Sequence, residues 1–395
     1  MPLKRILIIT DAVTQPLYTP RVRNLYHYFL QKGIEIDWIT EKYEPIPDNF
    51  NIKLHEIPFY KHKGIIGKLE WIIKNFLNIL FDYKNNYFTK KIQSLTKSKQ
   101  YDLVFCSTFH TFGLKAAYNI AKTKHIPLHI DLRDIAEQCN NNEYNKSKIA
   151  LGFIGNYYRK INISRRNKIL RQANSITTVS PWHVDFIKQL NPNTHLIYNG
   201  YDSNTFIPQY INSDYFDIIY TGKWYSPTLQ DPTLLFQALA EINNPQIRLI
   251  WYTNNDAHSQ IRDFTKQYNI TTPVIINGYV PNNEIPNILN QSSIILVLTN
   301  KGNRGIMTTK FFEAIGVEKP ILCVRSDEEC LAQTIQDTNA GLAATNAKEV
   351  KEFILHHYNQ WQKQGYTHID INNKQQFSRQ TQALQFEEIF NQILQ

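Results

Sequence analysis

Residues 294–324, IILVLTNKGNRGIMTTKFFEAIGVEKPILCV, contain the pattern that decides the fold. The apolar run 294–298 has the length and composition of a buried strand. A glycine-containing loop follows, then a helix that we expect to begin at Thr308 or Thr309, and Lys319-Pro320-Ile321-Leu322 opens the next apolar run. Strand, helix and strand in this order form a βαβ unit, so the sequence predicts a parallel sheet.

The same alternation extends through the chain in two series. A helical face such as Leu25, Tyr28, Phe29 and Lys32 separates strand-like runs in the first half, and a turn-rich stretch begins at 197–202. The alternation restarts after about residue 215, so we predict two α/β domains, each a doubly wound parallel sheet, over 1–198 and 199–376. The expected strands are 5–10, 34–39, 102–106, 127–131, 175–179, 217–221, 248–252, 274–277, 294–298 and 320–324, with a helix near 231–243.

Length and composition agree with a globular protein of two domains. The chain has 395 residues, enough for two domains of about 150–200 residues, and a hydrophobic fraction of 42%. No apolar run reaches the roughly 20 residues that cross a bilayer, and the first apolar run is too short for a signal peptide. The four cysteines form no C-x-x-C pair, which favours reduced thiols over a zinc site. We expect a cytoplasmic protein.

The net charge of +9 is concentrated in two segments. Residues 61–91 hold seven Lys against Glu70 and Asp82, and residues 144–171 hold eight Lys or Arg and no acid. The first segment has a wide apolar helical stripe edged with lysine, which suits the anionic inner face of a membrane. A long core helix with solvated lysines is the alternative. The stripe comprises Leu69, Ile72, Ile73, Phe76 and Leu80, widened by Trp71, Leu77 and Phe81 and flanked by Lys68, Lys74 and Lys84.

Nucleic acid is the other partner that basic segments suggest. Aromatic residues between basic ones, as in 153–166, can stack on single-stranded bases. The sequence matches no RNA- or DNA-binding module, so we expect no nucleic-acid partner.

The helix after strand 294–298 carries the clearest chemical pattern. Its first amides and its dipole form an anion site, and Lys310 adds a positive charge one turn in. Glu313 lies on the same face and can accept two hydrogen bonds from a ribose diol, so the helix fits a nucleotide. A capped helix with a surface Lys–Glu pair explains the spacing equally well. Ligands of doubly wound sheets bind beyond the carboxyl ends of the strands, so we expect the site in a cleft between the domains.

This segment resembles the donor-binding motif of the GT-B glycosyltransferases of family 4, which have a K-x-x-E helix before a KPIL-like strand. Other motifs of that family are matched along nearly the whole chain. These are 197–202 at the entry to the second domain, 220–223 with Asp231-Pro232 in its first loop, 277–281 as the base-binding loop, 131–134 in the first domain, and 377–395 as a final helix that crosses back to the first domain.

The resemblance implies a transfer, with retention, from a UDP- or GDP-sugar to a membrane-proximal glycan or lipid-linked acceptor in surface polysaccharide or glycoconjugate biosynthesis. The leaving diphosphate takes the acceptor proton and positive side chains replace a metal ion, so we expect neither a metal nor a cofactor. The implied catalytic residues are His110, Lys223 and Lys310. The implied donor-binding residues are Gly278, Tyr279, Val280, Gly305, Ile306, Met307, Thr308, Thr309 and Glu313. Asp131, Arg133 and Asp134 would face the cleft, with Arg21 and Arg23 near an anionic acceptor.

Several of these residues have plainer explanations, and the chain departs from the family pattern at three places. His110 can be a packed histidine, Asp131 and Arg133 an ion pair that orders a loop, and Lys223 a solvated lysine. Gly305 replaces the first acid of the family's E-x7-E pair, Gln230 replaces a basic residue, and 14–20 replaces a glycine-rich turn. Two alternatives therefore stay open: a nucleotide-sugar epimerase of the same fold, and a degenerate transferase that only binds.

Overall fold

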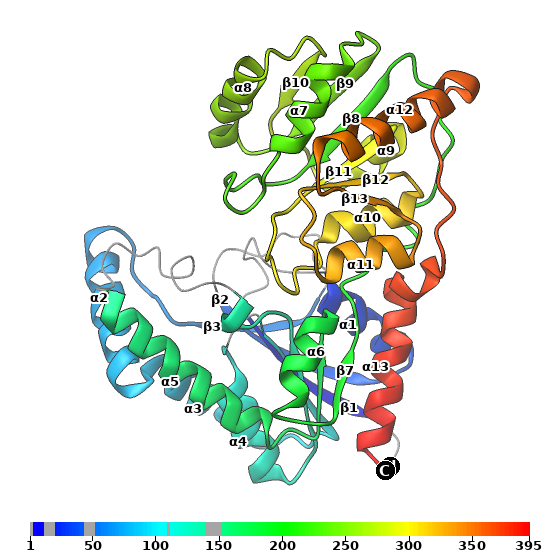
Figure 1. The fold of residues 1–395 in the computed structure, drawn as a ribbon. Helices are drawn as coiled ribbons and strands as arrows, with labels where there is room; N and C mark the ends of the chain where they lie inside the picture. The colour runs from blue at the N-terminus through cyan, green and yellow to red at the C-terminus, as the bar shows by residue number, and fades with distance from the viewer. Residues whose placement is uncertain (1–2, 12–19, 43–51, 109–110, 139–151) are drawn as a thin grey trace. The chain divides into compact units, whose positions relative to one another are not determined.

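The computed structural model describes residues 3–11, 20–42, 52–108, 111–138 and 152–395, except the side chains of 152–155 (Figure 1). The chain divides into two compact units, residues 1–198 with 383–395 and residues 199–382. Each unit is built on one parallel sheet with helices on its faces, which confirms the α/β fold class expected from the alternation.

Unit 1 has a seven-stranded sheet in the order β3-β2-β1-β4-β5-β6-β7. Its strands are β1 (Arg5–Thr10), β2 (Glu35–Lys42), β3 (Leu54–Pro58), β4 (Leu103–Thr108), β5 (Leu128–Leu132), β6 (Ser175–Thr178) and β7 (Thr194–Leu196). Its helices are α1 (Arg21–Gln31), α2 (Gly64–Phe81), α3 (Tyr83–Thr96), α4 (Leu114–Lys124), α5 (Gly152–Leu170) and α6 (Pro181–Lys188), with the 3-10 turn η2 (Ala136–Gln138).

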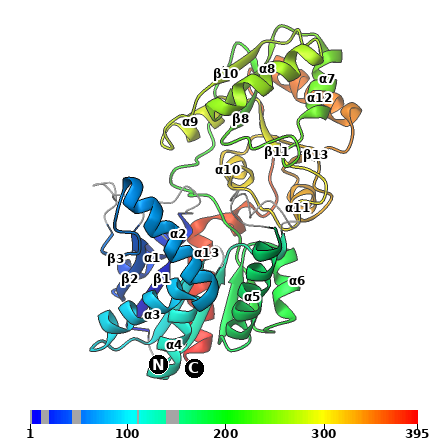
Figure 2. The same cartoon turned by 90° about the vertical axis from the view of Figure 1, so that its left-hand side faces the viewer.

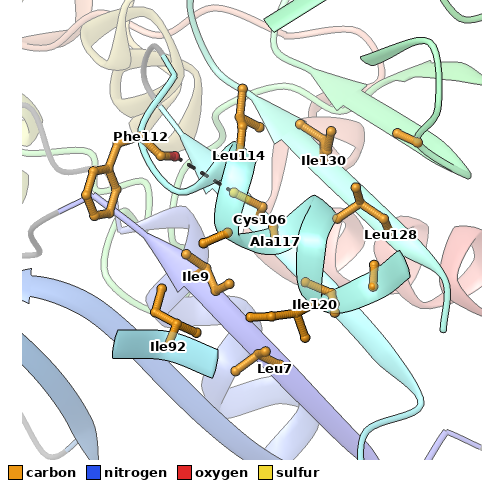
Figure 3. Packing of buried hydrophobic residues seen from close by; sticks show 14 of the residues in the cluster. Leu7, Ile9, Ile92, Cys106, Phe112, Leu114, Ala117, Ile120, Leu128 and Ile130 are labelled. Atoms are coloured by element: carbon orange, nitrogen blue, oxygen red, sulfur yellow. Dashed lines mark hydrogen bonds between the residues drawn. The ribbon is translucent and has the colours of Figure 1, made fainter. Parts of the chain in front are cut away.

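The central strand β1 shows how the unit 1 sheet is covered. Successive side chains of a strand point to opposite faces. Leu7 and Ile9 accordingly pack with residues of α3 and α4, such as Ile92 and Ile120, in one buried cluster (Figure 3). Ile6 and Ile8 face the other way, toward α1 and the end of the chain. Apolar residues on both faces are typical of a parallel sheet buried between helix layers.

The last helix, α13 (Arg379–Ile393), supplies part of the second layer of unit 1. Phe390 is fully buried, and its ring stacks on Phe29 of α1 with 5.5 Å between centroids. It also lies 5.7 Å from the Phe105 ring and 5.1 Å from the His129 ring. The C-terminal residues thereby close the face of the sheet that α1 alone leaves uncovered.

Unit 2 has a six-stranded sheet in the order β10-β9-β8-β11-β12-β13. Its strands are β8 (Phe216–Thr221), β9 (Ile247–Tyr252), β10 (Val274–Asn277), β11 (Ile294–Leu298), β12 (Ile321–Val324) and β13 (Gly341–Ala343). Its helices are α7 (Thr233–Ile242), α8 (His258–Gln267), α9 (Ile285–Gln291), α10 (Thr309–Val317), α11 (Cys330–Asp337) and α12 (Ala347–Gln364), with the 3-10 turns η3 (Asn255–Ala257) and η4 (Lys374–Phe377).

The strand order of unit 2 positions its loops. β8 lies at the centre and pairs with β9 on one side and β11 on the other, so the loops after β8 and β11 leave the sheet side by side. The strand order reverses between these two strands, which is where doubly wound sheets bind ligands. A parallel pairing also aligns β11 with β12, as the βαβ pattern of 294–324 predicts.

The helix α2 departs from the pattern of every layer described above. None of its 18 residues is buried, although it is apolar. Figure 2 shows it in blue at the front of unit 1. For α2 the core-helix explanation of segment 61–91 is therefore wrong, because the apolar stripe is exposed. The end of the segment lies in α3, which does bury Phe88. The most exposed large apolar residues of α2 are Ile65 (87%), Ile66 (65%), Phe81 (64%) and Phe76 (61%).

We predict that Phe390→Ala destabilises unit 1 by about 3–5 kcal/mol, because a fully buried phenyl ring is lost and a cavity remains. The control is Leu384→Ala, on the same helix but 56% exposed, which should change stability by less than about 0.5 kcal/mol. Urea unfolding followed by tryptophan fluorescence measures both. Equal losses for the two variants would show that α13 does not pack as described.

Candidate functional site

The loop between β11 and α10 is shaped by two glycines. Gly302 and Gly305 have φ of +83° and +67°, in the left-handed region that favours glycine. α10 then begins at Thr309, as the sequence predicts, and the side chain of Thr308 makes no capping hydrogen bond. The Phe311 amide donates to the Thr308 carbonyl at 3.2 Å, whereas no acceptor among the described residues takes the amides of Thr309 and Lys310. These two amides can therefore meet another partner. Next to them, Met307 is buried and Ile306 is 39% exposed.

Lys310 is the cation at this helix start. Its Nζ lies 5.3 Å from the centre of the Tyr220 ring, which is completely buried. Burial lowers the pKa of Lys310, and the nearby Glu313 charge opposes that shift. In the parts of the chain that the structure describes, no hydrogen bond or ion pair within 4.0 Å reaches this ammonium group. A desolvated cation without a hydrogen-bonding partner favours an anionic ligand.

Gly222 makes room for Lys310. It follows the last residue of β8 and has φ of +112°. A Cβ atom at this position would come within 2.8 Å of both Cε and Nζ of Lys310. The lysine end therefore lies directly against the turn, and both its place and the backbone angle require glycine.

Glu313 lies one turn after Lys310 and is half-buried. Burial raises its pKa to about 7, although the positive charges of Lys310 and Arg379 act in the opposite direction. A carboxyl group whose pKa is raised by burial and opposed by two nearby cations is typical of functional sites. Once ionised, its two oxygens can accept hydrogen bonds from a diol.

Side-chain amides join the loop after β11 to the loop after β8. Asn300 donates to the Thr228 carbonyl at 3.0 Å, and Asn303 donates to the Leu229 carbonyl at 2.9 Å. Gln230, which replaces a basic residue of the family pattern, accepts from the Tyr225 amide at 2.9 Å. Its own amide donates to the Tyr220 hydroxyl at 3.3 Å. At this position the amide shapes the loop after β8.

The loops after β8 and β10 present aromatic rings to solvent. Tyr225 is 54% exposed and Tyr279 is 60% exposed. Burial raises the pKa of Tyr279, and the nearby Tyr225 and Asp256 raise it further, so these side chains are neighbours. The exposed Lys223 lies over the Tyr225 ring, with its Nζ 4.7 Å from the ring centre. Gly278 and Val280 flank Tyr279, and both are half-exposed.

The predicted residues of unit 1 include a buried ion pair. Arg21 is 4% exposed and Asp131 is fully buried, and their side chains are joined by hydrogen bonds of 2.9 and 3.2 Å. Arg21 also donates to the carbonyl oxygens of residues 197–198 at 2.7 and 2.6 Å. Ser107 and Thr177 each donate to Asp131 at 2.8 Å. Burial would raise the pKa of Asp131, but Arg21 and these donors outweigh it and hold the pKa low.

Every polar atom of this pair is thus engaged within unit 1. The pair joins α1, β5 and residues 197–198. We therefore assign the pair to the fold and leave Arg21 out of the acceptor site.

The other predicted residues of unit 1 have different surroundings. Arg133 is buried and lies 3.2 Å from Asp11. Asp134 is half-buried, and burial raises its pKa to about 7 despite the opposing charge of Arg133. Arg23 is half-buried on α1, where its charge helps to lower the pKa of His27. His110 and the first part of the basic segment 144–171 lie outside the described residues.

Sequence reasoning missed three contributors to the unit 2 site. Arg379, at the start of α13, acts on Glu313 across 66 residues of sequence, and no motif links them. Gly222 stands in the recognised motif 220–223, and Tyr225 follows it by two residues. The role of Gly222 depends on the distance to Lys310, and that of Tyr225 on its exposure. The glycine after a strand was the available signal for a close backbone approach.

Comparisons with known proteins extend along most of the chain. The family Glycosyltransferase Family 4 matches residues 20–205, and the family Glycosyl transferase-like matches residues 233–374. A search of curated proteins finds no match.

Solved structures match the chain over its whole length. It is similar to sucrose-phosphate synthase from Thermosynechococcus elongatus, with 14% identity, a TM-score of 0.70 and 99% of each chain covered. A glycosyltransferase from Rickettsia africae gives 13% identity and a TM-score of 0.68 with 100% of each covered. Anabaena HepE in complex with UDP-glucose gives 14% identity and 0.65, covering 98% of this chain and 99% of that one. These likenesses show the fold.

We predict that ligand-free Glu313→Gln gains stability relative to the wild-type protein as pH rises from about 4.5 to about 7. The folded carboxyl has a pKa near 7 and the unfolded one an ordinary value, so the folded state binds the extra proton in this window. Wild-type stability from this group is complete below the window and is lost as pH rises through 7, whereas glutamine does not titrate. Thermal unfolding across pH measures the difference, which exposed Glu352→Gln should not show.

Proposed function

Because the chain belongs to the family 4-like glycosyltransferases of the GT-B fold, we propose that it transfers a sugar with retention from a UDP- or GDP-sugar to a membrane-proximal glycan or lipid-linked acceptor. The observation that carries the donor part is the start of α10. There the amides of Thr308 and Thr309, the half-buried cation of Lys310 and the Glu313 carboxyl group of raised pKa follow one another along the first turns of the helix. The complex of Anabaena HepE with UDP-glucose, a protein of similar fold, supports the choice of donor class.

Each part of a nucleotide diphosphate has a chemical counterpart in unit 2. The diphosphate suits Lys310 and the amides of Thr308 and Thr309, because a helix start and a desolvated cation both favour negative charge. Glu313 suits the ribose diol as a double acceptor. The rings of Tyr225 and Tyr279, exposed beside the loop after β10, suit the base, since a ring face can stack on any base.

The proposed chemistry needs charge stabilisation more than a nucleophile. The bond between the anomeric carbon and the diphosphate breaks, and the acceptor oxygen bonds to the same face of that carbon. The acceptor proton passes to the leaving phosphate oxygen. Lys310 and Lys223 stabilise the charge that develops on the diphosphate, so the reaction is proposed to proceed without a metal ion.

We predict that UDP or GDP, tested in buffer with EDTA, raises the melting temperature of the wild-type protein by binding to the native state. Glu313→Ala should weaken that nucleotide at least about tenfold, because hydrogen bonds to a charged group are lost. Lys310→Met should weaken it further, by removal of the cation that meets the diphosphate. The matched controls are Glu352→Ala and Lys348→Met, two exposed residues of α12.

The result separates the proposed enzyme from its alternatives. Binding that the α10 variants leave unchanged would overturn the donor site. A bound UDP-sugar that is epimerised, with neither transfer to an acceptor nor slow hydrolysis, would favour the epimerase. Binding without turnover of any donor would favour the degenerate transferase.

The acceptor part of the proposal rests on α2. No helix in the described ranges is long and apolar enough to span a bilayer. α2 nevertheless exposes a stripe of large apolar side chains, including Leu69 (58%), Ile72 (53%) and Phe76 (61%). A surface helix of this kind suits the interfacial layer of a membrane, and we propose contact with the cytoplasmic face of the inner membrane.

Not all the lysines in and near α2 are available to bind anionic lipid. Lys74 pairs with Glu70 at 2.6 Å and also donates to the Phe59 carbonyl, and Lys84 pairs with Glu41 at 2.7 Å. Lys68 is exposed. The apolar stripe therefore carries more of the proposed membrane affinity than the sequence suggests, and the charges carry less.

We predict that Ile72→Ser with Phe76→Ser lowers binding to phosphatidylglycerol-containing liposomes at least about tenfold, because burial of each side chain contributes about 1.5–3 kcal/mol. Sedimentation with liposomes measures it. Leu384→Ser, which removes an exposed apolar side chain elsewhere on unit 1, should leave binding unchanged. Salt should weaken wild-type binding only in part, and complete loss at high salt would contradict the apolar contribution.

A further inference from the structure

Unit 1 contains a cavity of about 440 Å³ on the side of the sheet covered by α3 and α4. It lies among the end of α2, the start of α3, and the helices α4 and α5. Its volume is within the range of about 300–1,000 Å³ that small-molecule sites occupy. The motifs that place the donor in unit 2 make no use of it.

The wall of this cavity has two chemically different parts. Leu80, Phe81, Leu114 and Ile169 contribute apolar surface. Lys115, Arg165 and Lys168 contribute positive charge. Arg166 also lines the cavity, but Glu137 neutralises it through hydrogen bonds of 2.9 and 2.6 Å.

A single carboxylate in the wall balances only part of that charge. Asp82 is 5% exposed and accepts hydrogen bonds from Lys115 at 3.0 Å and from Asn85 at 2.7 Å. Nη1 of Arg165 lies 3.4 Å from Asp82, yet it is buried and has no hydrogen-bond partner among the described residues. Lys168 is exposed. The cavity thus retains excess positive charge and a buried donor without an acceptor, which an anion would satisfy.

The apolar part of the cavity continues onto the exposed stripe of α2. Leu80 and Phe81 line the cavity while 51% and 64% of their surface remains exposed. Leu80 follows Phe76 and Ile73 at helical spacing, so the stripe leads along α2 to the cavity mouth. A ligand that fits both parts has an anionic head and a hydrocarbon chain.

We propose that this cavity binds the phosphate head of a lipid, with Arg165 and Lys168 on the phosphate oxygens and the chain along Phe81 and the α2 stripe. The inference rests on the proposed membrane contact and gives it a defined lipid site. Charge complementarity selects a phosphate, because each of its oxygens accepts charge-assisted hydrogen bonds from arginine and lysine. The apolar wall selects the lipid form over free phosphate.

The test titrates the full-length protein with dodecyl phosphate below its micelle concentration, followed by calorimetry and by the phosphorus NMR signal of the head group. Inorganic phosphate and dodecyl maltoside are titrated in parallel. We expect saturable binding of dodecyl phosphate, at least about tenfold weaker binding in Arg165→Gln, and a smaller loss in Lys168→Gln. Lys160→Gln removes an exposed charge of the same helix outside the cavity and should bind as wild type.

The apolar part has its own pair of variants. Phe81→Ser should weaken dodecyl phosphate, whereas Ile65→Ser, at the opposite end of α2 and 87% exposed, should not. Lys168→Gln keeps the test decisive if Arg165→Gln unfolds, because Lys168 is exposed and supports no buried group. Equal binding of inorganic phosphate, equal binding of dodecyl maltoside, or unchanged binding in Lys168→Gln and Phe81→Ser would each overturn the proposal.

A parallel thermal-shift measurement with UDP and GDP separates this inference from the proposed function. Stabilisation by a nucleotide without any binding of dodecyl phosphate would overturn the lipid site and leave the transferase intact. Binding of dodecyl phosphate without any nucleotide effect would do the reverse.

Discussion

The close approach of the Lys310 ammonium group to the Gly222 turn is the constraint on which the unit 2 site depends. Its Nζ would be within 2.8 Å of a Cβ at Gly222, so the lysine reaches this place because the residue directly after β8 is a glycine with φ of +112°. There the charge is desolvated over Tyr220, and it lacks a hydrogen-bonding partner in the described chain. Such an arrangement costs folding free energy, and an anionic ligand offsets that cost on binding.

The buried charges of unit 1, in contrast to Lys310, have hydrogen-bonding partners within the protein. Arg21 and Asp131 have acceptors or donors on every polar atom, so their ion pair is complete without a ligand. The sequence made Lys310 and the Arg21–Asp131 pair candidates for the functional site alike. Only the hydrogen bonds seen in the structure distinguish the lysine from the ion pair. A buried charge that is fully satisfied holds the fold together. The half-buried Lys310, and Nη1 of Arg165, which lies 3.4 Å from Asp82 but makes no hydrogen bond in the described chain, leave bonding capacity for something outside the chain.

The sequence predicts the fold well because apolar periodicity is local. Strands β1, β10 and β11 begin and end where their apolar runs do, and α10 begins at Thr309. The strands that it misses are the edge strands β3, β7 and β13. β7 and β13 have three residues each, too few to show a period, and β3 mixes polar with apolar residues. The site was predictable only where its residues share one helix. The effect of Arg379 on Glu313 and the ion pair of Lys84 with Glu41 depend on tertiary contacts that no local pattern encodes.

The position of α2 is maintained although none of its residues is buried. At its start, Glu70 accepts from the amides of Lys61 and His62 and from Lys74, and the Lys74 bond lowers the pKa of Glu70 to about 2. At its end, Asn78 donates to Tyr158 of α5 at 2.7 Å and Asp82 holds the turn into α3. Polar bonds thus fix both ends of a helix none of whose residues is fully buried. Because exposed apolar surface of this extent favours association, α2 is best explained as a contact surface that unit 1 holds in place for a partner of apolar character.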